Sequence, residues 1–122
     1  MAKNLEISFL LDFYGEVLTE KQREVMEQYY NDDLSLAEIA DHFDITRQGV
    51  RDAIKRGEAT VLELEEKIGF ARRYRAMQEG LVAIESHCRN MLYCNEADYH
   101  PSNEITKSGA ALLDVIKKLN QS

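Results

Sequence analysis

The segment TRQGVRDAIKRGE, residues 46–58, carries the side chains best suited to contact a nucleic acid. Val50 and Ile54 are apolar and one helical turn apart, so the spacing predicts an α-helix whose inner face they occupy. The polar side chains then point the other way, because each residue turns the helix by about 100°. Arg pairs with guanine through two hydrogen bonds, and Gln pairs with adenine in the same manner. We predict the following nucleic-acid-binding residues: Thr46, Arg47, Gln48, Arg51, Asp52, Lys55 and Arg56.

The start of the same helix suits a phosphate. Thr46 is a residue type that caps helices, and the first N–H groups after it have no partner inside the helix. An anion therefore fits there, and Gly49 lets a backbone come close. The alternative interpretation is that the exposed cations are only solvated, and Asp52 repels a nearby phosphate.

Residues 35–54, SLAEIADHFDITRQGVRDAI, have the spacing of a helix-turn-helix. Ser35 and Glu38 form a capping box that opens the first helix. Ala40 is small enough for two helices to approach closely, and Asp44 tolerates the left-handed backbone of a tight turn. The apolar contacts between the two helices come from Ile39, Phe43, Ile45 and Val50.

The net charge of −7 limits what this unit can hold. Residues 1–68 contain 8 Lys or Arg against 16 Asp or Glu, whereas residues 69–122 contain 7 against 6. Long-range attraction to DNA is therefore poor, although salt screens such effects beyond roughly 8 Å. Residues 46–58 hold only four cations, and specific DNA binders make about 6–10 phosphate contacts. Two copies with their reading helices about 34 Å apart would supply that number.

A second candidate basic patch lies in GFARRYRAM, where three arginines surround Phe70 and Tyr74: Arg72, Arg73 and Arg75. Cations beside exposed aromatic rings can hold RNA through its backbone and bases. The favoured alternative is that Phe70 and Tyr74 are core residues and the arginines form a solvated face.

Neither a metal, nor a cofactor, nor catalysis is predicted. The spacing of His87, Cys88, Cys94 and His100 matches no common zinc pattern, and Cys88 lies on an apolar stripe, which predicts a buried cysteine. The sequence lacks a phosphate-binding glycine loop, a zinc-protease motif and a nucleophile elbow. We expect a protein that is not an enzyme.

Helical spacing continues through nearly the whole chain, and strand signals are scarce, which predicts an all-α fold of roughly six helices. The expected helices span residues 4–14, 19–31 after a Thr19–Gln22 capping box, 35–43, 47 to about 68, 74–91 and 104–119. Gly57 and Gly69 each weaken the fourth helix by about 1 kcal/mol, and we expect a kink or break near Gly69. Residues 93–103 are expected to form a loop.

The elements predict a helix-turn-helix domain at residues 1–68 and a helical C-terminal extension at 69–122. The extension packs on that domain or on a second subunit, and we expect the two segments to form one structural unit. Its apolar stripes, from Tyr74 to Met91 and from Ile105 to Leu119, exceed what one small chain can bury, so we expect a homodimer through these helices. No apolar run approaches the roughly 18 residues of a membrane span, and the N-terminus lacks a signal-peptide cleavage site. We expect a cytoplasmic protein with reduced thiols.

The stretch LTEKQREVMEQYYNDDLSLAEIADHFDITRQGVRDAIKR resembles region 4 of bacterial sigma factors, which reads a promoter element. It is still more similar to the YlxM family of small bacterial proteins, and that similarity covers almost the whole chain, including the helical tail. The resemblance implies a sigma-like helix-turn-helix and an auxiliary or regulatory role in the signal recognition particle pathway. The sigma-type reading positions correspond here to Arg47, Gln48, Arg51 and Lys55. The acidic surroundings depart from the sigma pattern and argue against promoter binding.

Three hypotheses follow from these residues and this resemblance. The leading one is a non-catalytic regulatory or accessory protein that binds the RNA of the signal recognition particle, its GTPase, or both. The second is a DNA-binding transcriptional regulator that uses the same helix in a major groove. The third is a protein-interaction module that binds no nucleic acid.

Overall fold

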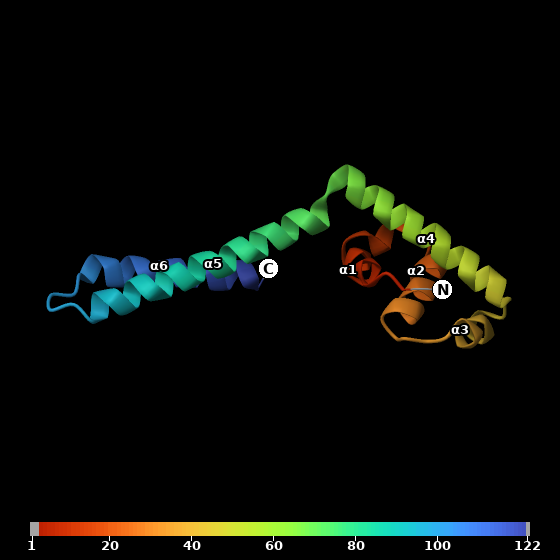
Figure 1. Ribbon diagram of the computed structural model, residues 1–122, viewed down its shortest axis with the longest axis horizontal. Coiled ribbons are helices and arrows are strands. Elements are labelled where there is room, and N and C mark those ends of the chain that lie inside the picture. Colours follow the sequence, from red (N-terminus) through yellow and green to blue (C-terminus); the bar gives the residue numbers. More distant parts are fainter. Residues whose placement is uncertain (1–2, 122) are drawn as a thin grey trace. The chain divides into compact units, whose positions relative to one another are not determined.

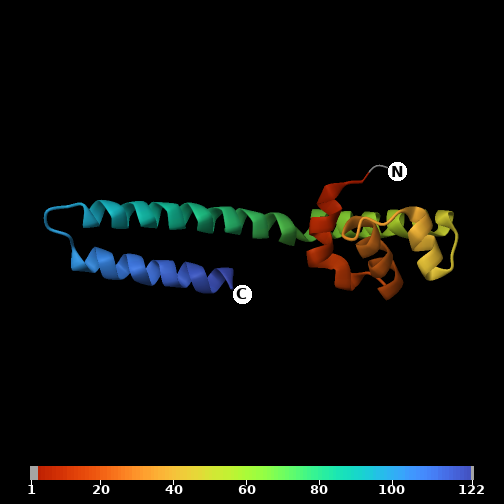
Figure 2. The same ribbon diagram turned by 90° about the horizontal axis from the view of Figure 1, so that it is seen from below.

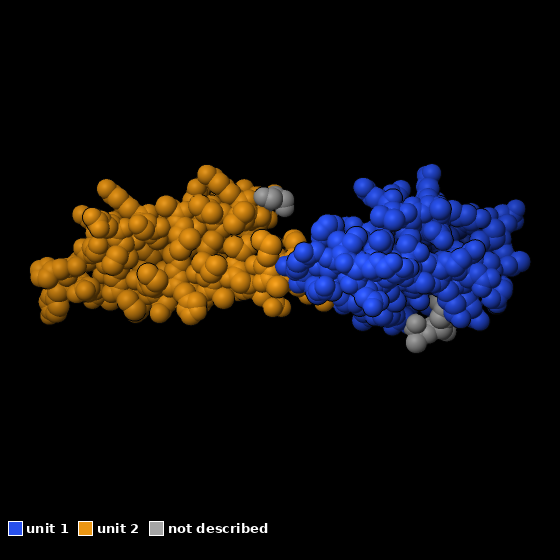
Figure 3. Space-filling view, turned by 90° about the horizontal axis from the view of Figure 1, so that it is seen from above, with its two compact units in different colours: residues 1–73 blue, residues 74–122 orange. Residues whose placement is uncertain are grey.

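The computed structural model describes residues 3–121, and within that range the fold is all-α, as predicted. The helices are α1 (Leu5–Tyr14), α2 (Glu20–Tyr30), α3 (Leu36–Phe43), α4 (Arg47–Ile68), α5 (Phe70–Glu96) and α6 (Asn103–Asn120), with a 3₁₀ turn, η1, at Gly15–Val17 (Figures 1 and 2). The chain divides into two compact units, residues 1–73 and 74–122 (Figure 3). None of the helices in residues 3–121 is both long enough and apolar enough to cross a membrane.

Side-chain caps begin the helices of the first unit where the sequence predicts them. Thr19 with Gln22 and Ser35 with Glu38 both form complete capping boxes. In the second box the Glu38 N–H donates to Ser35 Oγ at 3.1 Å, and the Ser35 N–H donates to the Glu38 carboxylate at 3.2 Å. Thr46 Oγ1 accepts from the Gly49 N–H at 2.9 Å and starts α4. These contacts satisfy N–H groups that the first turn of a helix leaves without partners.

The first unit is built around α4, which contacts α1, α2 and α3 (Figure 1). Two apolar clusters hold these helices together. One joins α1 and α2 to the second half of α4, with Ile7, Met26 and Val61 fully buried. The other joins α2 and α3 to the first half of α4, with Val25 and Ile39 fully buried. The recognition motif therefore rests on the same helix that anchors the rest of the unit.

Gly57 is required by the packing between α2 and α4, a role that its predicted cost to the helix does not reveal. The residue is buried, and a Cβ built on it would lie 2.0 Å from Met26 Sδ. Met26 is itself fully buried in α2. Glycine is therefore the residue that lets α2 and α4 approach this closely.

The predicted break near Gly69 is confirmed. Gly69 adopts a left-handed backbone with φ 72° and ψ 26°, and α4 ends before it. The Glu65 carboxylate accepts hydrogen bonds from the Ala71 N–H at 3.0 Å and the Arg72 N–H at 3.1 Å. It also accepts one at 2.7 Å from the Tyr14 hydroxyl, whose oxygen in turn accepts from the Phe70 N–H at 3.1 Å. We call this arrangement the Glu65 corner.

The second unit is a hairpin in which α5 and α6 run antiparallel, side by side (Figures 1 and 2). The loop between them is shorter than the predicted 93–103, because α5 continues to Glu96. Asn95 explains the difference: it is buried, its Nδ2 donates to the Ser102 carbonyl at 3.1 Å, and its Oδ1 accepts from the Ser102 N–H at 2.8 Å. A helical asparagine therefore closes this loop from inside α5.

Candidate nucleic-acid interface

The turn between α3 and α4 has the geometry that the sequence predicts. Asp44 lies in the left-handed region with φ 53° and ψ 48°, and its backbone N–H donates to the Ala40 carbonyl. The Ile45 N–H donates to the same carbonyl at 3.1 Å. Ala40 and Val50 are buried where the helices meet. The two helices therefore form a helix-turn-helix, with α4 as the recognition helix.

Most of the predicted nucleic-acid-binding side chains are exposed to solvent. These are Thr46, Arg47, Gln48, Asp52, Lys55 and Arg56. Arg51 is half-buried, and its Nε atom is buried without a hydrogen-bond partner in the described part of the chain. A buried guanidinium N–H without an acceptor is costly, and an acceptor from a bound ligand would remove that cost.

Several cations in other parts of the protein are paired with acids. Ion pairs join Lys3 to Asp33, Lys67 to Glu63 and Arg89 to Glu85. By contrast, within residues 3–121 no ion pair or hydrogen bond occupies the side chains of the four recognition-helix cations: Arg47, Arg51, Lys55 and Arg56. Asp52 on the same face of α4 accepts a hydrogen bond from Gln48 Nε2 at 2.9 Å. The charge of these cations is therefore available to phosphates.

Two hollows flank the recognition helix. We call the first the α3 hollow. It has a volume of about 420 Å³ and lies between the start of α3 and the start of α4, lined by Ser35, Leu36, Ala37, Arg47, Gln48 and Arg51. The capping box uses the N–H groups of Ser35 and Glu38 but not those of Leu36 and Ala37, which together with the two guanidinium groups make the hollow a suitable place for an anion.

The second hollow, which we call the α2 hollow, lies beside the start of α2. It has a volume of about 360 Å³ and is lined by residues of α2, the turn and α4: Thr19, Lys21, Gln22, Ile45, Gly49, Ala53 and Arg56. The α4 residues of the two hollows lie roughly half a turn apart around that helix. Gln48, Asp52 and Lys55 project between them.

The sequence did not predict that the starts of α2 and α3 lie beside the recognition helix. Lys21 and the first turns of α2 and α3 were not among the predicted contacts. The signal was present in the two capping boxes, which mark helix starts, but the sequence alone does not tell that both starts lie beside α4. That placement depends on the buried contacts of Val25, Ile39 and Val50.

The second basic patch differs from the recognition helix because two of its three arginines bind backbone. Arg72 Nη1 donates to the Glu65 carbonyl at 3.4 Å, and Arg73 donates to the carbonyls of Ile68 and Gly69, the latter at 3.3 Å. Phe70 and Tyr74 are 55% and 49% exposed, so the expectation that they are core residues was wrong. Phe70 stacks on Tyr14, with ring centroids 6.5 Å apart. RNA binding at Arg72, Arg73 and Arg75 stays a prediction.

The histidines and cysteines do not gather at one place. Cys88 is buried, as predicted, with Sγ 3.5 Å from the Gly109 carbonyl oxygen, whereas Cys94 is exposed. His42 is exposed, and its Nδ1 lies 3.0 Å from Gln28 Oε1. In the described range no three His, Cys, Asp or Glu side chains are grouped as metal ligands would be.

Comparison with known proteins agrees with this geometry. The family UPF0122, described as "Putative helix-turn-helix protein, YlxM / p13 like", matches residues 1–98. A UPF0122 protein of Acetivibrio thermocellus is 50% identical over 74 residues, which are 61% of this chain and 63% of that protein. One from Halalkalibacterium halodurans is 49% identical over 83 residues (68% of this chain, 76% of that protein). One from Desulforamulus reducens is 37% identical over 113 residues, which are 93% and 92% of the two chains.

Proposed function

The chain belongs to the UPF0122 family of YlxM/p13-like helix-turn-helix proteins, and from this premise we propose that it is a non-catalytic regulatory protein whose recognition helix binds duplex DNA. In this proposal the first three turns of α4 enter a major groove. Gln48 and Lys55 meet base edges or nearby phosphates, and Arg47 and Arg51 bind the backbone on one side.

The observation that carries the proposal is the pair of hollows beside α4. A helix in the major groove has a phosphate backbone on each side, and each hollow combines a helix start with at least one cation. Phosphates bind readily at helix N-termini because free N–H groups and the helix dipole both favour an anion. Arg51 in the α3 hollow and Lys21 with Arg56 in the α2 hollow would then contact the two strands.

Groove dimensions favour DNA over duplex RNA as the ligand. The major groove of B-DNA is about 12 Å wide and admits an α-helix. The major groove of A-form RNA is deep and narrow, and side chains cannot read it. An exposed helix flanked by two anion sites therefore suits B-DNA, while RNA would have to be held in a single-stranded or looped region.

The acidic net charge makes one copy a weak binder. Four recognition-helix cations fall short of the roughly 6–10 phosphate contacts of specific DNA binders. A homodimer with two recognition helices about one DNA turn apart would provide twice as many. We therefore propose that the binding form has two copies or a partner protein.

The narrower role in the signal recognition particle pathway rests on the family resemblance. In this narrower proposal the protein acts in the cytoplasm, where it binds the particle RNA and the GTPase. The unpaired cations of α4 would contact the RNA backbone, and Arg75 with its neighbours would be a second RNA contact.

The test compares binding of the wild type and an Arg51→Ala/Lys55→Ala variant to a pool of random-sequence DNA duplexes, to the particle RNA and to the purified GTPase. A Lys107→Ala/Lys117→Ala variant is the matched control, since it removes the same charge from exposed positions of α6. We expect salt-sensitive DNA binding that falls at least tenfold in the α4 variant and is retained in the control. Lys21→Ala should weaken DNA binding by a smaller factor.

The proposal fails if the wild type binds no duplex, or if the α4 variant binds as tightly as the control. RNA binding that the α4 variant abolishes, without any DNA binding, would support the particle role instead. GTPase binding that ignores both the variant and the salt would indicate a protein-interaction module.

A further inference from the structure

The α5–α6 hairpin buries very little of itself. Within residues 74–121 the buried side chains are those of Cys88, Asn95 and Ile116. A Cβ on Gly109 would lie 2.4 Å from Leu92 Cδ2, so the two helices are already in close contact and cannot approach further. Helices draw most of their stability from packing an apolar face, and a hairpin this small has no sufficient core of its own.

The apolar residues that a core would need are present but exposed. On α5, Met77, Ile84 and Met91 recur every seven residues and are 66%, 47% and 61% exposed. On α6, Ile105, Leu112 and Leu119 recur at the same interval and are 42%, 42% and 49% exposed. A seven-residue repeat keeps side chains on one face of a helix that packs against other helices. We call these six residues the apolar face.

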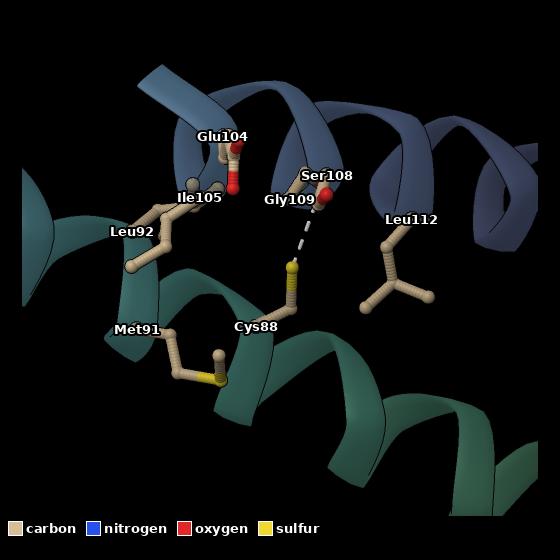
Figure 4. Close-up of a pocket in the computed structure, with 8 residues that line it drawn as sticks. All are labelled: Cys88, Met91, Leu92, Glu104, Ile105, Ser108, Gly109 and Leu112. Atoms are coloured by element: carbon tan, nitrogen blue, oxygen red, sulfur yellow. Dashed lines mark hydrogen bonds between the residues drawn. The ribbon is translucent and has the colours of Figure 1, made fainter. Parts of the chain in front are cut away.

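Three residues of the apolar face, Met91, Ile105 and Leu112, line one groove. It has a volume of about 310 Å³ and lies between the helices, with Met91 and Leu92 from α5 and Ile105 and Leu112 from α6 on its walls and Cys88 at its base (Figure 4). Because the helices are antiparallel, Met91 lies at the same end as Ile105, and Met77 at the same end as Leu119. The apolar face therefore runs along the hairpin in three layers.

The other groove of the hairpin carries charged side chains beside Ala110, Leu113 and Ile116. Glu85 and Arg89 form an ion pair at 2.9 Å, and both line this second groove together with Asp114 and Lys117. Charged side chains therefore gather at this second groove, whereas the first groove is mostly apolar.

We propose that the apolar face of the hairpin docks on the same face of a second copy, forming a four-helix bundle. Six side chains of this size and exposure present roughly 600 Å² per copy, so pairing would bury about 1,200 Å², the lower bound of stable specific interfaces. The matching seven-residue stripes on α5 and α6 are what two copies need in order to interdigitate around a twofold axis.

The small net charge of the hairpin and the constant availability of a second copy both favour that copy as the partner of the apolar face. Residues 74–122 contain five Lys or Arg and six Asp or Glu, so two hairpins meet almost without repulsion. The apolar face is exposed to water whenever the chain is folded without a partner. A second copy of the chain is the one partner that is always present in equal amount. This inference concerns a surface distant in sequence from the recognition helix and does not depend on nucleic-acid binding.

Sedimentation of the full chain at micromolar concentration tests the proposal. The wild type should sediment at twice the monomer mass of 14.0 kDa. Ile84→Lys and Leu112→Lys place a charge in the middle layer and should give monomers. The matched control is Val82→Lys: Val82 is 66% exposed but lies on roughly the opposite side of α5, so this variant should remain a dimer.

A wild type that is monomeric at these concentrations would overturn the proposal and leave the face to the chain's own first unit or to another protein. A dimer that survives both apolar-face variants, or that Val82→Lys also dissociates, would overturn the assignment of the face.

Methionine oxidation of the wild type covers the case in which the Lys variants fail to fold. Hydrogen peroxide oxidises accessible methionines to sulfoxides, which mass spectrometry counts residue by residue. In the dimer, Met77 and Met91 should be oxidised about as slowly as the fully buried Met26. Oxidation at least tenfold faster than at Met26 would mean that the face is free and would contradict the proposal.

Discussion

Glu65 joins three elements of the first unit, because its carboxylate binds Tyr14 of α1 and the start of α5 from the end of α4. Burial alone would raise the pKa of this carboxyl. The hydrogen bonds from Tyr14, Ala71 and Arg72 and the nearby Arg72 guanidinium outweigh that effect and hold the pKa below its ordinary value of 4.5. Burial and the hydrogen bond to Glu65 raise the pKa of the Tyr14 hydroxyl. Glu65 is therefore charged in the folded protein.

Because the pKa of Glu65 is lowered in the folded state, its contribution to the free energy of unfolding decreases as the pH falls. The folded state favours the carboxylate, so the contribution of Glu65 is complete above pH 4.5 and is lost as the pH falls below that value. Glu65→Gln should cost about 1–2 kcal/mol of unfolding free energy near pH 7. Urea denaturation at about pH 6 and pH 3 should show a smaller acid-induced loss in the variant than in the wild type. An equal loss in both proteins would contradict the role of Glu65.

A second prediction about a single residue concerns Gly57. Gly57→Ala should destabilise the protein by about 1–3 kcal/mol, because the new methyl group overlaps Met26 inside a packed core. Gly80→Ala is the matched control, since no atom lies within 4 Å of its added Cβ. This exposed helical substitution should stabilise α5 by about 0.5–1 kcal/mol. Thermal denaturation should therefore shift in opposite directions for the two variants.

The prediction from the sequence and the structure agree best on where the helices begin and end. Capping boxes predicted the starts of α2 and α3, and the apolar spacing predicted α4 up to its last residue. These signals are local, so they are visible without the fold. The end of α5 was missed because Asn95 closes the loop through a residue seven positions away. The need for Gly57 was missed because Met26 belongs to another helix.

The turn between α3 and α4 carries a prediction of its own. Asp44 occupies a left-handed conformation that glycine adopts without strain. Asp44→Gly should raise the unfolding free energy by about 0.5–1 kcal/mol, whereas Asp44→Ala should lower it by a similar amount. Urea titrations of the two variants provide the measurement, and a destabilising Asp44→Gly would show that the aspartate makes a contact worth more than the strain.

At the scale of the molecule, an acidic protein carries, within residues 3–121, four cations without an acidic partner on the recognition helix α4 and an exposed apolar face on α5 and α6. The sequence predicted both the cationic set and the apolar stripes. It did not predict the hollows beside α4, because these depend on where α2 and α3 start relative to that helix. Nor did it predict at which groove of the hairpin the charged side chains gather, since that follows from how α5 meets α6.

Salt dependence of binding connects the two proposals. Each phosphate contact contributes about −0.9 to the slope of log K against log salt concentration on B-DNA. Four cations per copy therefore predict a slope of about −7 for the dimer and about −4 for a monomeric Ile84→Lys variant. Titrations of duplex DNA at several salt concentrations measure both slopes. Equal slopes in a wild type shown to be dimeric would mean that only one recognition helix touches DNA.

The Glu65 corner also determines when the first unit can be completed during synthesis. Tyr14 and Glu65 are 51 positions apart, and α1 packs against Val61 and Ala71. A ribosome makes α1 first, yet its apolar residues stay without partners until α4 and the corner have been translated. A nascent chain arrested before residue 71 therefore exposes the apolar side chains of residues 5–14, and chaperones and proteases act on such exposed segments.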